Sequence, residues 1–436
     1  MLLPCDGASS KAEPTALQRP ALRYHGTVIP GDLIKRRAIE CGFDLVGITS
    51  LPVAEGPEFA RRWLQKGFGG EMHYLRNPKR EDPRLVLPSA RSAILVGLVY
   101  NTSLPYSTEC VGKETAGTQG REAGQPPHPS DGLRAWISRY AWGRDYHSVM
   151  RERLERLREA LVALAPGAET RVYVDTGPVN ERALARSSGI GWMGKNTLII
   201  NQQKGSWFFL GVVLTSLELA PDGPAPDRCG SCTRCLDACP TGALVQPYVM
   251  DASRCIAYLT IELKGAIPEK LRPAVGRNVF GCDICQDVCP WNSTSPRQGE
   301  TRLTHQHPAT TEIPEFQPLR LTIPHPAGQG LNGFGDSFSL FNPSLENLTA
   351  LTAEDFQTAF RNSPIKRAKY RGWLRNLCIA VGNSGDTRFV PWLRRLLHYP
   401  DALVQEHALW ALRRVEANQS AVECAPATAQ PPMLGN

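Results

Sequence analysis

One stretch of the chain, residues 229–290, decides how the rest is interpreted. It begins with Cys229-Gly-Ser-Cys232-Thr-Arg-Cys235-Leu-Asp-Ala-Cys239-Pro240 and ends with Cys282-Asp-Ile-Cys285-Gln-Asp-Val-Cys289-Pro290. The first run has C-x2-C-x2-C-x3-C-P spacing, in which three thiolates of one tight loop reach three iron atoms of one four-iron cluster. The second run keeps only the last three cysteines of that pattern, and Cys255 is the obvious substitute for the missing one. Eight cysteines are what two four-iron clusters require.

Two-cluster bacterial ferredoxins use this spacing with crossed ligands, so that the last cysteine of each run binds the cluster of the other run. The similarity implies that one cluster is held by Cys229, Cys232, Cys235 and Cys289, and the other by Cys239, Cys255, Cys282 and Cys285. Zinc is the competing interpretation, since paired C-x2-C elements also build zinc ribbons, but zinc leaves the longer run unexplained. Disulfides are less favoured still, because the cysteines gather in two short loops of a chain that looks intracellular.

Composition and length bound the class of protein. The chain has 436 residues, enough for two or three domains, and its apolar content of 42% is ordinary for a soluble protein. The longest apolar run, residues 207–214, is too short to cross a bilayer, and the first residues show no secretory signal. We therefore expect a cytoplasmic protein without a membrane segment. The net charge of +7 hints at an anionic partner.

Three stretches are expected to lie outside the folded domains. Residues 1–28 lack an apolar period and indicate a loose tail. Residues 108–132, rich in Gly, Pro, Glu, Thr and Gln, indicate a surface insertion. Residues 297–343, rich in His, Pro, Thr and Gly, indicate a linker or insertion.

The N-terminal part predicts alternating helices and strands. A helix from Gly31 carries Ile34, Ala38 and Ile39 on one face, and residues 43–49 and 92–100 are predicted to be buried strands. This alternation favours an α/β domain.

Asp145, Tyr146 and His147 stand at the entry to a helix in which leucines at 154, 157, 161 and 164 recur every three or four residues. Exposed side chains at such an entry can meet a ligand. The simpler alternative stays equally open: Asp145 caps the helix and His147 is a surface residue of its first turn.

Asp175 ends the predicted strand Arg171-Val-Tyr-Val-Asp175, and Gly177-Pro178 turns the chain after it. Because carboxyl ends of strands line the ligand crevice in α/β folds, Asp175 is a candidate catalytic acid. The alternative is a turn-forming aspartate that bonds backbone amides.

Gly189-Ile-Gly191-Trp-Met-Gly194 matches the dinucleotide-binding fingerprint letter for letter. That motif must follow a strand and open a helix, whereas residues 181–187 predict a helix before it and residues 197–201 predict a strand after it. We therefore expect these glycines to let the backbone pass close to a bulky cofactor, or to turn the chain.

The C-terminal part predicts amphipathic helices over residues 364–381, 387–398 and 402–415, a pattern that suggests a small HEAT-like unit. In the first of them, a basic ridge is predicted from Arg367, Arg371 and Arg375, with Lys366 and Lys369 on its other flank. A basic helix is usually only a solvated face, but the absence of acids from residue 361 through 375 favours binding of phosphate backbone.

These features together resemble epoxyqueuosine reductases, the cobalamin-dependent iron–sulfur enzymes of queuosine-tRNA synthesis. The resemblance covers about residues 31–415 and rests on several stretches in the same order. They are Arg139-Tyr-Ala-Trp-Gly-Arg-Asp-Tyr-His147, Val174-Asp-Thr-Gly-Pro178, Gly191-Trp-Met-Gly-Lys-Asn196, Gly205-Ser-Trp-Phe-Phe-Leu-Gly211, the cluster cysteines, and Ser363-Pro-Ile-Lys-Arg-Ala-Lys369.

The resemblance implies a three-part architecture. A cobalamin-binding α/β (α+β) domain related to reductive dehalogenases would span residues 29–218, and a ferredoxin-like domain with two [4Fe-4S] clusters would span 219–296. A HEAT-like α-helical domain that helps to grip tRNA would span 344–418, before a tail over 419–436. The implied cofactors are the two clusters and cobalamin. The implied partners are tRNA and an external low-potential electron donor, and we expect a monomer.

The implied reaction removes the epoxide oxygen of epoxyqueuosine at the wobble position of the anticodon, with two electrons, two protons and loss of water. Asp175 resembles the proton donor, and burial beside the corrin is expected to raise its pKa and keep it protonated. Asp145 and His147 resemble residues near the substrate face of the corrin. Cofactor contacts are expected from Arg144, Tyr146, Gly191, Trp192, Gly194, Lys195 and Asn196. Contacts to tRNA are expected from Lys366, Arg367, Lys369, Arg371 and Arg375.

Two other classes of function compete. A corrinoid reductase of small molecules, such as a dehalogenase, would explain the cysteines but not the acid-free basic helix. An electron carrier or tRNA-binding module without catalysis would leave Asp175, Asp145 and His147 without a purpose.

Overall fold

The computed structural model describes residues 29–53, 57–110, 133–292, 309–322 and 337–423. The predicted tail at 1–28, most of the predicted tail at 419–436, most of the predicted insertion 108–132 and two parts of the predicted linker 297–343 lie outside the described residues. Residues 419–423 belong instead to the last helix, which ends at Glu423.

A four-stranded antiparallel sheet forms the centre of the N-terminal part, with strand order β1-β2-β7-β4. Its strands are β1 (Leu45–Ser50), β2 (Ser92–Val99), β4 (Thr170–Tyr173) and β7 (Phe208–Thr215). Strands β2 and β7 pair along their whole length, from Ser92 opposite Thr215 to Val99 opposite Phe208. Every residue of β2 is buried, which fits the nearly continuous apolar sequence that follows Ser92. The two predicted strands near residues 43–49 and 92–100 are confirmed.

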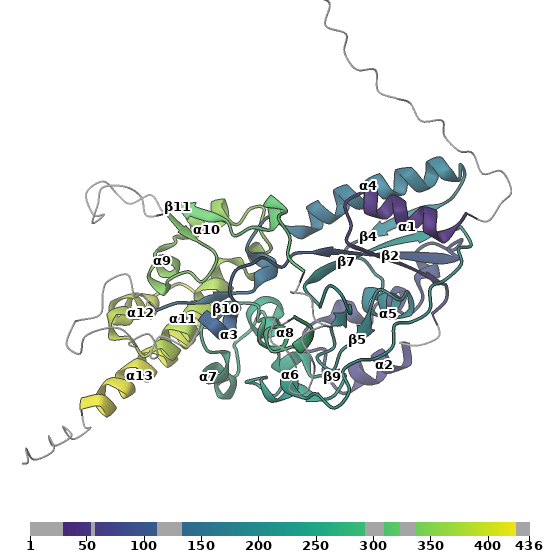
Figure 1. Ribbon diagram of the computed structural model, residues 1–436. Helices are drawn as coiled ribbons and strands as arrows, with labels where there is room; N and C mark the ends of the chain where they lie inside the picture. Colours follow the sequence, from purple (N-terminus) through teal and green to yellow (C-terminus); the bar gives the residue numbers. More distant parts are fainter. Residues whose placement is uncertain (1–28, 54–56, 111–132, 293–308, 323–336, 424–436) are drawn as a thin grey trace, which may run out of the picture.

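Helices cover both faces of this sheet (Figure 1). Helices α1 (Gly31–Glu40) and α4 (Tyr146–Leu164) pack on one face, and α5 (Glu181–Ser187) packs on the other. The leucine period of α4 is confirmed, since all four leucines are buried. On α1 the prediction for Ile39 was wrong. Ile39 is 51% exposed, because it lies a further 100° round the helix from the buried Ala38.

The antiparallel pairing also corrects the α/β expectation. Alternating helices and strands usually indicate a parallel sheet. Here each neighbouring pair runs antiparallel, so the domain is of the α+β kind. Asp175 does follow β4, but the rule about parallel strand ends that selected it does not apply to this sheet.

The cysteine-rich segment consists of short elements. Two single-turn helices, α6 (Arg234–Asp237) and α8 (Ile284–Asp287), carry the centres of the two cysteine runs and contact one another. Strand β10 (Asn278–Phe280) pairs in parallel with β3 (Trp136–Ile137), which precedes α4 in the chain. The cysteine-rich segment is thereby tied to the sheet domain.

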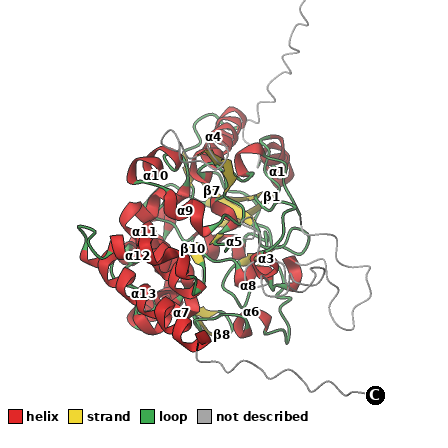
Figure 2. Cartoon of the chain, turned by 90° about the vertical axis from the view of Figure 1, so that its left-hand side faces the viewer, coloured by secondary structure: helices red, strands yellow, loops and turns green. Residues whose placement is uncertain are grey.

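The C-terminal part is α-helical (Figure 2). It contains α9 (Leu345–Ala350), α10 (Ala353–Ala359), α11 (Lys369–Ser384), α12 (Val390–Leu396) and α13 (Ala402–Glu423). Helix α13 packs along α11 and α12. Their buried side chains share one continuous core with Trp136, Trp142 and Phe280. The helical part is therefore not an independent module, although it begins near the predicted boundary.

The predicted linker is more ordered than expected where it is described. Strands β11 (Arg320–Thr322) and β12 (Ser337–Ser339) form a hairpin-like pair, and Phe338 is buried in the core under the C-terminal helices. Phe316 is buried in the core of the sheet domain.

The remaining regular elements are short. They are α2 (Pro57–Gln65), α3 (Ser107–Cys110), α7 (Arg272–Val275), β5 (Trp192–Met193), β6 (Ile199–Ile200), β8 (Leu244–Gln246) and β9 (Val249–Met250). Helix α5 comes before the β5–β6 hairpin, in the order opposite to a dinucleotide-binding motif, so rejecting that motif was right. Among the described residues, no helix combines the length and the apolar character needed to span a bilayer.

Candidate active site

The first turn of α4 carries the first acid–base pair. Asp145 caps the helix by accepting the backbone N–H of His147 at 3.1 Å. The same carboxylate stands 2.7 Å from Nδ1 of the His147 ring. The capping alternative and the functional one are therefore compatible, because the cap also orients the imidazole.

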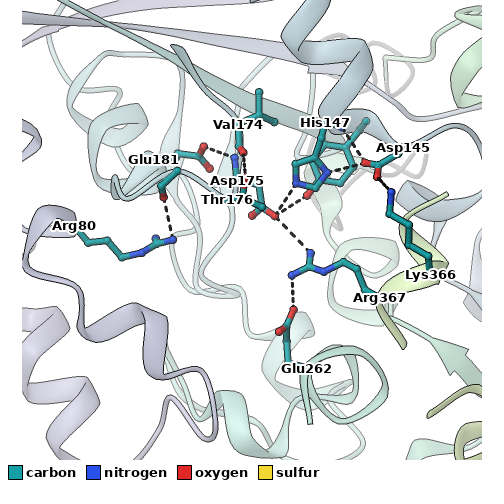
Figure 3. Close-up of polar contacts among 12 residues, drawn as sticks. Arg80, Asp145, His147, Val174, Asp175, Thr176, Glu181, Glu262, Lys366 and Arg367 are labelled. Carbon is teal, nitrogen blue, oxygen red and sulfur yellow. Dashed lines mark hydrogen bonds and ion pairs between the residues drawn. The ribbon is translucent and has the colours of Figure 1, made fainter. Parts of the chain in front are cut away.

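Asp175 meets this pair from the turn after β4 (Figure 3). Its Oδ2 accepts the Tyr146 hydroxyl at 2.8 Å and stands 3.4 Å from Nε2 of His147. The Tyr146 ring is held by stacking on Phe209, with ring centroids 4.2 Å apart and planes 3° from parallel. The Asp175 side chain is 45% exposed, so its carboxylate can meet a bound molecule.

Two cations reach this centre from the short 3₁₀ turn Pro364–Ala368, which precedes α11. Nζ of Lys366 lies 2.9 Å from Oδ2 of Asp145. The Arg367 guanidinium lies 3.6 Å from Oδ2 of Asp175 and donates to Glu262 at 2.7 Å. The start of α4, the turn after β4 and the 3₁₀ turn before α11 thus meet at one site. In this site acidic side chains lie next to basic ones.

This arrangement sets the protonation states. Burial alone would raise the pKa of Asp175, but hydrogen bonds from His147 and Tyr146 and the charge of Arg367 lower it to about 2. Burial would lower the pKa of His147, but Asp145 and Asp175 raise it to about 9. At neutral pH the histidine is therefore protonated and Asp175 is a carboxylate. The expectation that burial keeps Asp175 protonated is therefore not supported.

We expect the His147 charge to stabilise the fold in a defined pH range. A histidine whose folded pKa is raised contributes its stabilisation fully below its unfolded pKa of about 6.5 and loses it as the pH rises through the folded value. With a folded pKa of about 9, the loss should amount to about 3 kcal/mol between pH 6 and 9.5. Denaturant unfolding at both pH values measures it. His147→Gln serves as the reference, and an equal change in that variant would contradict the prediction.

The cysteines expected to hold the first cluster come together in one pocket. Cys229, Cys232, Cys235 and Cys289 line it, together with Lys195 and Asn196. Cys289 comes from the second cysteine run and the other three come from the first run, which matches the crossed arrangement.

The second group of thiols is half-buried, and its members influence one another's charge. Burial and the neighbouring thiols Cys255 and Cys285 raise the pKa of Cys282 well above its usual value. Burial also raises the pKa of Cys255, with a further contribution from Cys239. No three His, Cys, Asp or Glu side chains in the described ranges converge as ligands of a single metal ion.

The segment 191–196 faces these cysteines. Nζ of Lys195 donates to the backbone carbonyls of Gly230 and Cys232 at 2.6 and 2.9 Å. The amide of Asn196 donates to the carbonyl of Cys285 at 3.3 Å. Both residues therefore hold the cluster-binding loops in place.

The other expected cofactor contacts have local roles. A Cβ on Gly191 would lie 2.3 Å from the carbonyl of Ile200, and one on Gly194 would lie 2.5 Å from the Ile200 side chain, so both glycines serve the β5–β6 hairpin. Trp192 packs beside Cys289. Arg144 pairs with Glu152 on the surface.

The predicted basic ridge is wrong in its geometry. Lys369 has φ of 56° and separates the 3₁₀ turn from α11, so Arg367 and Arg371 are not on one helix face. Arg371 and Lys369 are exposed, and Arg371 pairs with Asp401 at 2.8 Å. Arg375 is only 1% exposed and cannot contact an RNA phosphate.

Arg375 instead stabilises the fold. Its guanidinium donates to the carbonyls of Leu259, Leu263 and Gly265, which lie in and after the π turn Tyr258–Glu262. Because each buried carbonyl left without a donor costs about 1–3 kcal/mol, Arg375→Met should destabilise the protein by about 3 kcal/mol or more. Arg371→Met, which breaks only an exposed ion pair, should change the unfolding free energy by less than about 1 kcal/mol. Equal stabilities in denaturant unfolding would contradict this assignment.

Several residues of the site were not found from the sequence. Glu262 pairs with Arg367, and Glu181 accepts the backbone N–H of Asp175 at 2.5 Å. Arg80 donates to the carbonyls of Gly177 and Val179. None stands in a recognisable motif. The only local signal was that Glu181 lies within six residues of Asp175.

Two cysteine groups with ferredoxin spacing, in a chain that also brings Asp175 and His147 together, define the class of protein, an iron–sulfur oxidoreductase. Family models agree: "4Fe-4S double cluster binding domain" matches residues 228–292, and "Epoxyqueuosine reductase QueG, DUF1730" matches residues 80–176. An epoxyqueuosine reductase of Pseudomonas aeruginosa is 40% identical over 388 residues, covering 87% of this chain and 93% of that protein. The chain belongs to the epoxyqueuosine reductase family.

Solved structures of the family are also similar. One is an epoxyqueuosine reductase with an epoxyqueuosine-modified tRNA-Tyr stem loop, which aligns with TM-score 0.68 and 30% identity over 91% of this chain and 94% of that chain. Another, from Bacillus subtilis, has its catalytic aspartate loop swung out of the active site. It aligns with TM-score 0.65 and 28% identity over 91% of this chain and 95% of that chain.

Proposed function

We propose that this protein reduces epoxyqueuosine to queuosine in the wobble position of tRNA. The observation that carries the proposal is the cluster of Asp175, His147, Tyr146 and Arg367 around one accessible carboxylate, in a chain whose relatives are epoxyqueuosine reductases. The reaction converts an epoxide, two electrons and two protons into an alkene and water. The two C–O bonds of the epoxide break, and its oxygen leaves with both protons.

The two [4Fe-4S] clusters would supply the electrons, because each can carry one electron at a time. We assign Cys229, Cys232, Cys235 and Cys289 to one cluster. We assign Cys239, Cys255, Cys282 and Cys285 to the other. Lys195 and Asn196 hold the loops that bear these ligands.

One of the two protons comes from the acid–base pair, and the other comes from solvent. His147 carries a proton at neutral pH, and its Nε2 faces the carboxylate of Asp175. Asp175 would take this proton and pass it to the epoxide oxygen as the C–O bond breaks, acting as a relay. Asp145 and Lys366 keep the imidazole oriented during the transfer. The relay supplies a proton without requiring Asp175 to be protonated at rest.

Cobalamin is part of the proposal. When bound, it would supply low-potential cobalt that engages the substrate carbon or stabilises a radical next to it. The exposed edge of Asp175 fits a site where substrate lies between a cofactor and a carboxylate. Tyr146 and Arg144 remain expected contacts, whereas segment 191–196 lies against the cysteines. The relation to reductive dehalogenases stays a prediction.

Recognition of tRNA would use the helical C-terminal part. A relative has been solved with a tRNA stem loop, and Lys369 and Arg371 are exposed basic residues of α11 in this chain. Lys366 and Arg367 would approach the modified nucleotide, since they already lie at the acid–base site. The HEAT-like character, the monomeric state, the cytoplasmic location and the external low-potential electron donor stay predictions.

Anaerobic turnover tests the function directly. Reconstituted protein, with and without cobalamin, is incubated with a low-potential reductant and tRNA that bears epoxyqueuosine. The tRNA is then digested, and the masses of its nucleosides are measured by mass spectrometry. Loss of one oxygen only in the presence of cobalamin is expected. Unchanged tRNA from protein that carries cobalamin and both clusters would contradict the proposal and favour a reductase of small molecules.

A further inference from the structure

The turn that carries Asp175 has a backbone conformation that it would not adopt without support. Asp175 has φ of 50°, in the left-handed region that non-glycine residues rarely occupy. The next peptide bends back sharply, since the N–H of Thr176 donates to the carbonyl of Val174 at 2.5 Å. Gly177 then packs directly on Tyr173, and a Cβ there would lie 2.4 Å from that ring.

Glu181 supports this turn from one side (Figure 3). Its Oε1 accepts the backbone N–H of Asp175 at 2.5 Å. Glu181 stands in the first turn of α5, whose Leu184 and Ala185 are buried against the sheet, so the acceptor has a fixed position.

Arg80 supports the end of the turn. Its guanidinium donates to the carbonyls of Gly177 and Val179, both at 3.1 Å. The guanidinium also lies over the ring of Tyr74, 5.4 Å from the centroid. The turn is therefore held through an amide at its start and two carbonyls at its end.

We propose that Glu181 and Arg80 are positioning residues that clamp the turn 174–179 and hold the Asp175 carboxylate against His147, Tyr146 and Arg367. The clamp rests on the proposed function for its effect on turnover. The position of the turn itself can be measured without turnover.

Electrostatics favours a positioning role for Glu181 over a simple surface role. Burial and the nearby charge of Asp175 raise the pKa of Glu181 to about 8. With this pKa, Glu181 is mostly a neutral carboxyl at neutral pH and adds little negative charge beside Asp175. As a neutral carboxyl it still accepts the backbone N–H of Asp175 at 2.5 Å.

The test begins with amide hydrogen exchange of the peptide that contains residues 174–179, in the full-length protein with both clusters. Glu181→Leu removes the acceptor and should speed exchange of this peptide by about tenfold or more, as expected for one lost hydrogen bond. Glu181→Gln keeps an Oε1 acceptor and should stay close to the wild type. Arg80→Met releases the end of the turn and should also speed exchange.

Glu354→Leu is the matched control, since Glu354 is an exposed first-turn glutamate of another seven-residue helix, α10. It should leave the exchange of residues 174–179 unchanged. Unaltered exchange in both Glu181→Leu and Arg80→Met would overturn the proposal, whatever the enzyme's substrate proves to be.

Turnover separates positioning from substrate binding. Glu181→Leu should lower kcat about tenfold while the KM for the modified tRNA stays within about twofold, and Glu181→Gln should restore most of kcat. Fast exchange with unchanged kcat would also overturn the proposal, because the turn would then be released without harm. Absence of turnover in the wild type would count against the proposed function and leave the exchange result intact.

Discussion

Asp175→Asn is expected to reduce turnover of the modified tRNA by about 100-fold or more, because positioned proton transfer contributes at least that much to such reactions. The amide is nearly isosteric and can still accept the Tyr146 hydroxyl, but it cannot take a proton from His147. Single-turnover rates with reduced protein measure the loss. Cofactor content and unfolding free energy should stay near wild type.

Asp32→Asn provides the control, since Asp32 is an exposed aspartate in the first turn of α1. It should retain full turnover. Full activity in Asp175→Asn would remove Asp175 from the mechanism and make His147 the candidate proton donor.

The second large effect concerns the crossed cluster ligands. If Cys289 binds the same cluster as Cys232, the double variant Cys232→Ala/Cys289→Ala loses one cluster and should keep about four irons per chain. If Cys285 and Cys289 bind different clusters, Cys285→Ala/Cys289→Ala should lose both clusters and nearly all iron. Iron and sulfide analysis with electron paramagnetic resonance of the reduced protein measures the outcome.

Cys41→Ala is the reference for this pair of variants, because Cys41 only ends helix α1. It should keep about eight irons per chain. The alternative is that each cysteine run holds its own cluster. In that case Cys285→Ala/Cys289→Ala would keep about four irons per chain, and Cys232→Ala/Cys289→Ala would lose nearly all iron.

The sequence predicted those features that depend on spacing along the chain. The cysteine runs, the leucine period of α4, the extent of α5 and the position of Asp145 at a helix entry all follow from neighbours within a few residues. The function was predicted from several stretches that resemble those of epoxyqueuosine reductases. All these signals lie within short segments of sequence, so they can be recognised without knowledge of the fold.

Other features depend on which distant segments meet. The antiparallel sheet, the burial of Arg375 and the pairing of Arg367 with Asp175 and Glu262 arise from long-range packing. The basic ridge failed for this reason, because a left-handed residue at Lys369 interrupts the helical period on which it was based. The prediction of a raised pKa for Asp175 was wrong for the same reason. The sequence suggested that Asp175 is buried, but it did not show that His147 and Arg367 lie next to its carboxylate.

The shared core under the C-terminal helices has a consequence for how the protein is made. Trp136, Trp142 and Phe280 are covered by side chains that follow residue 337, and Arg375 bonds the turn after Cys255. The ribosome must therefore release almost the entire polypeptide before the cysteine-rich segment can reach its final form. We therefore expect iron to be inserted late, into a nearly complete chain. Truncated chains that lack the C-terminal helices should aggregate instead of forming a smaller reductase.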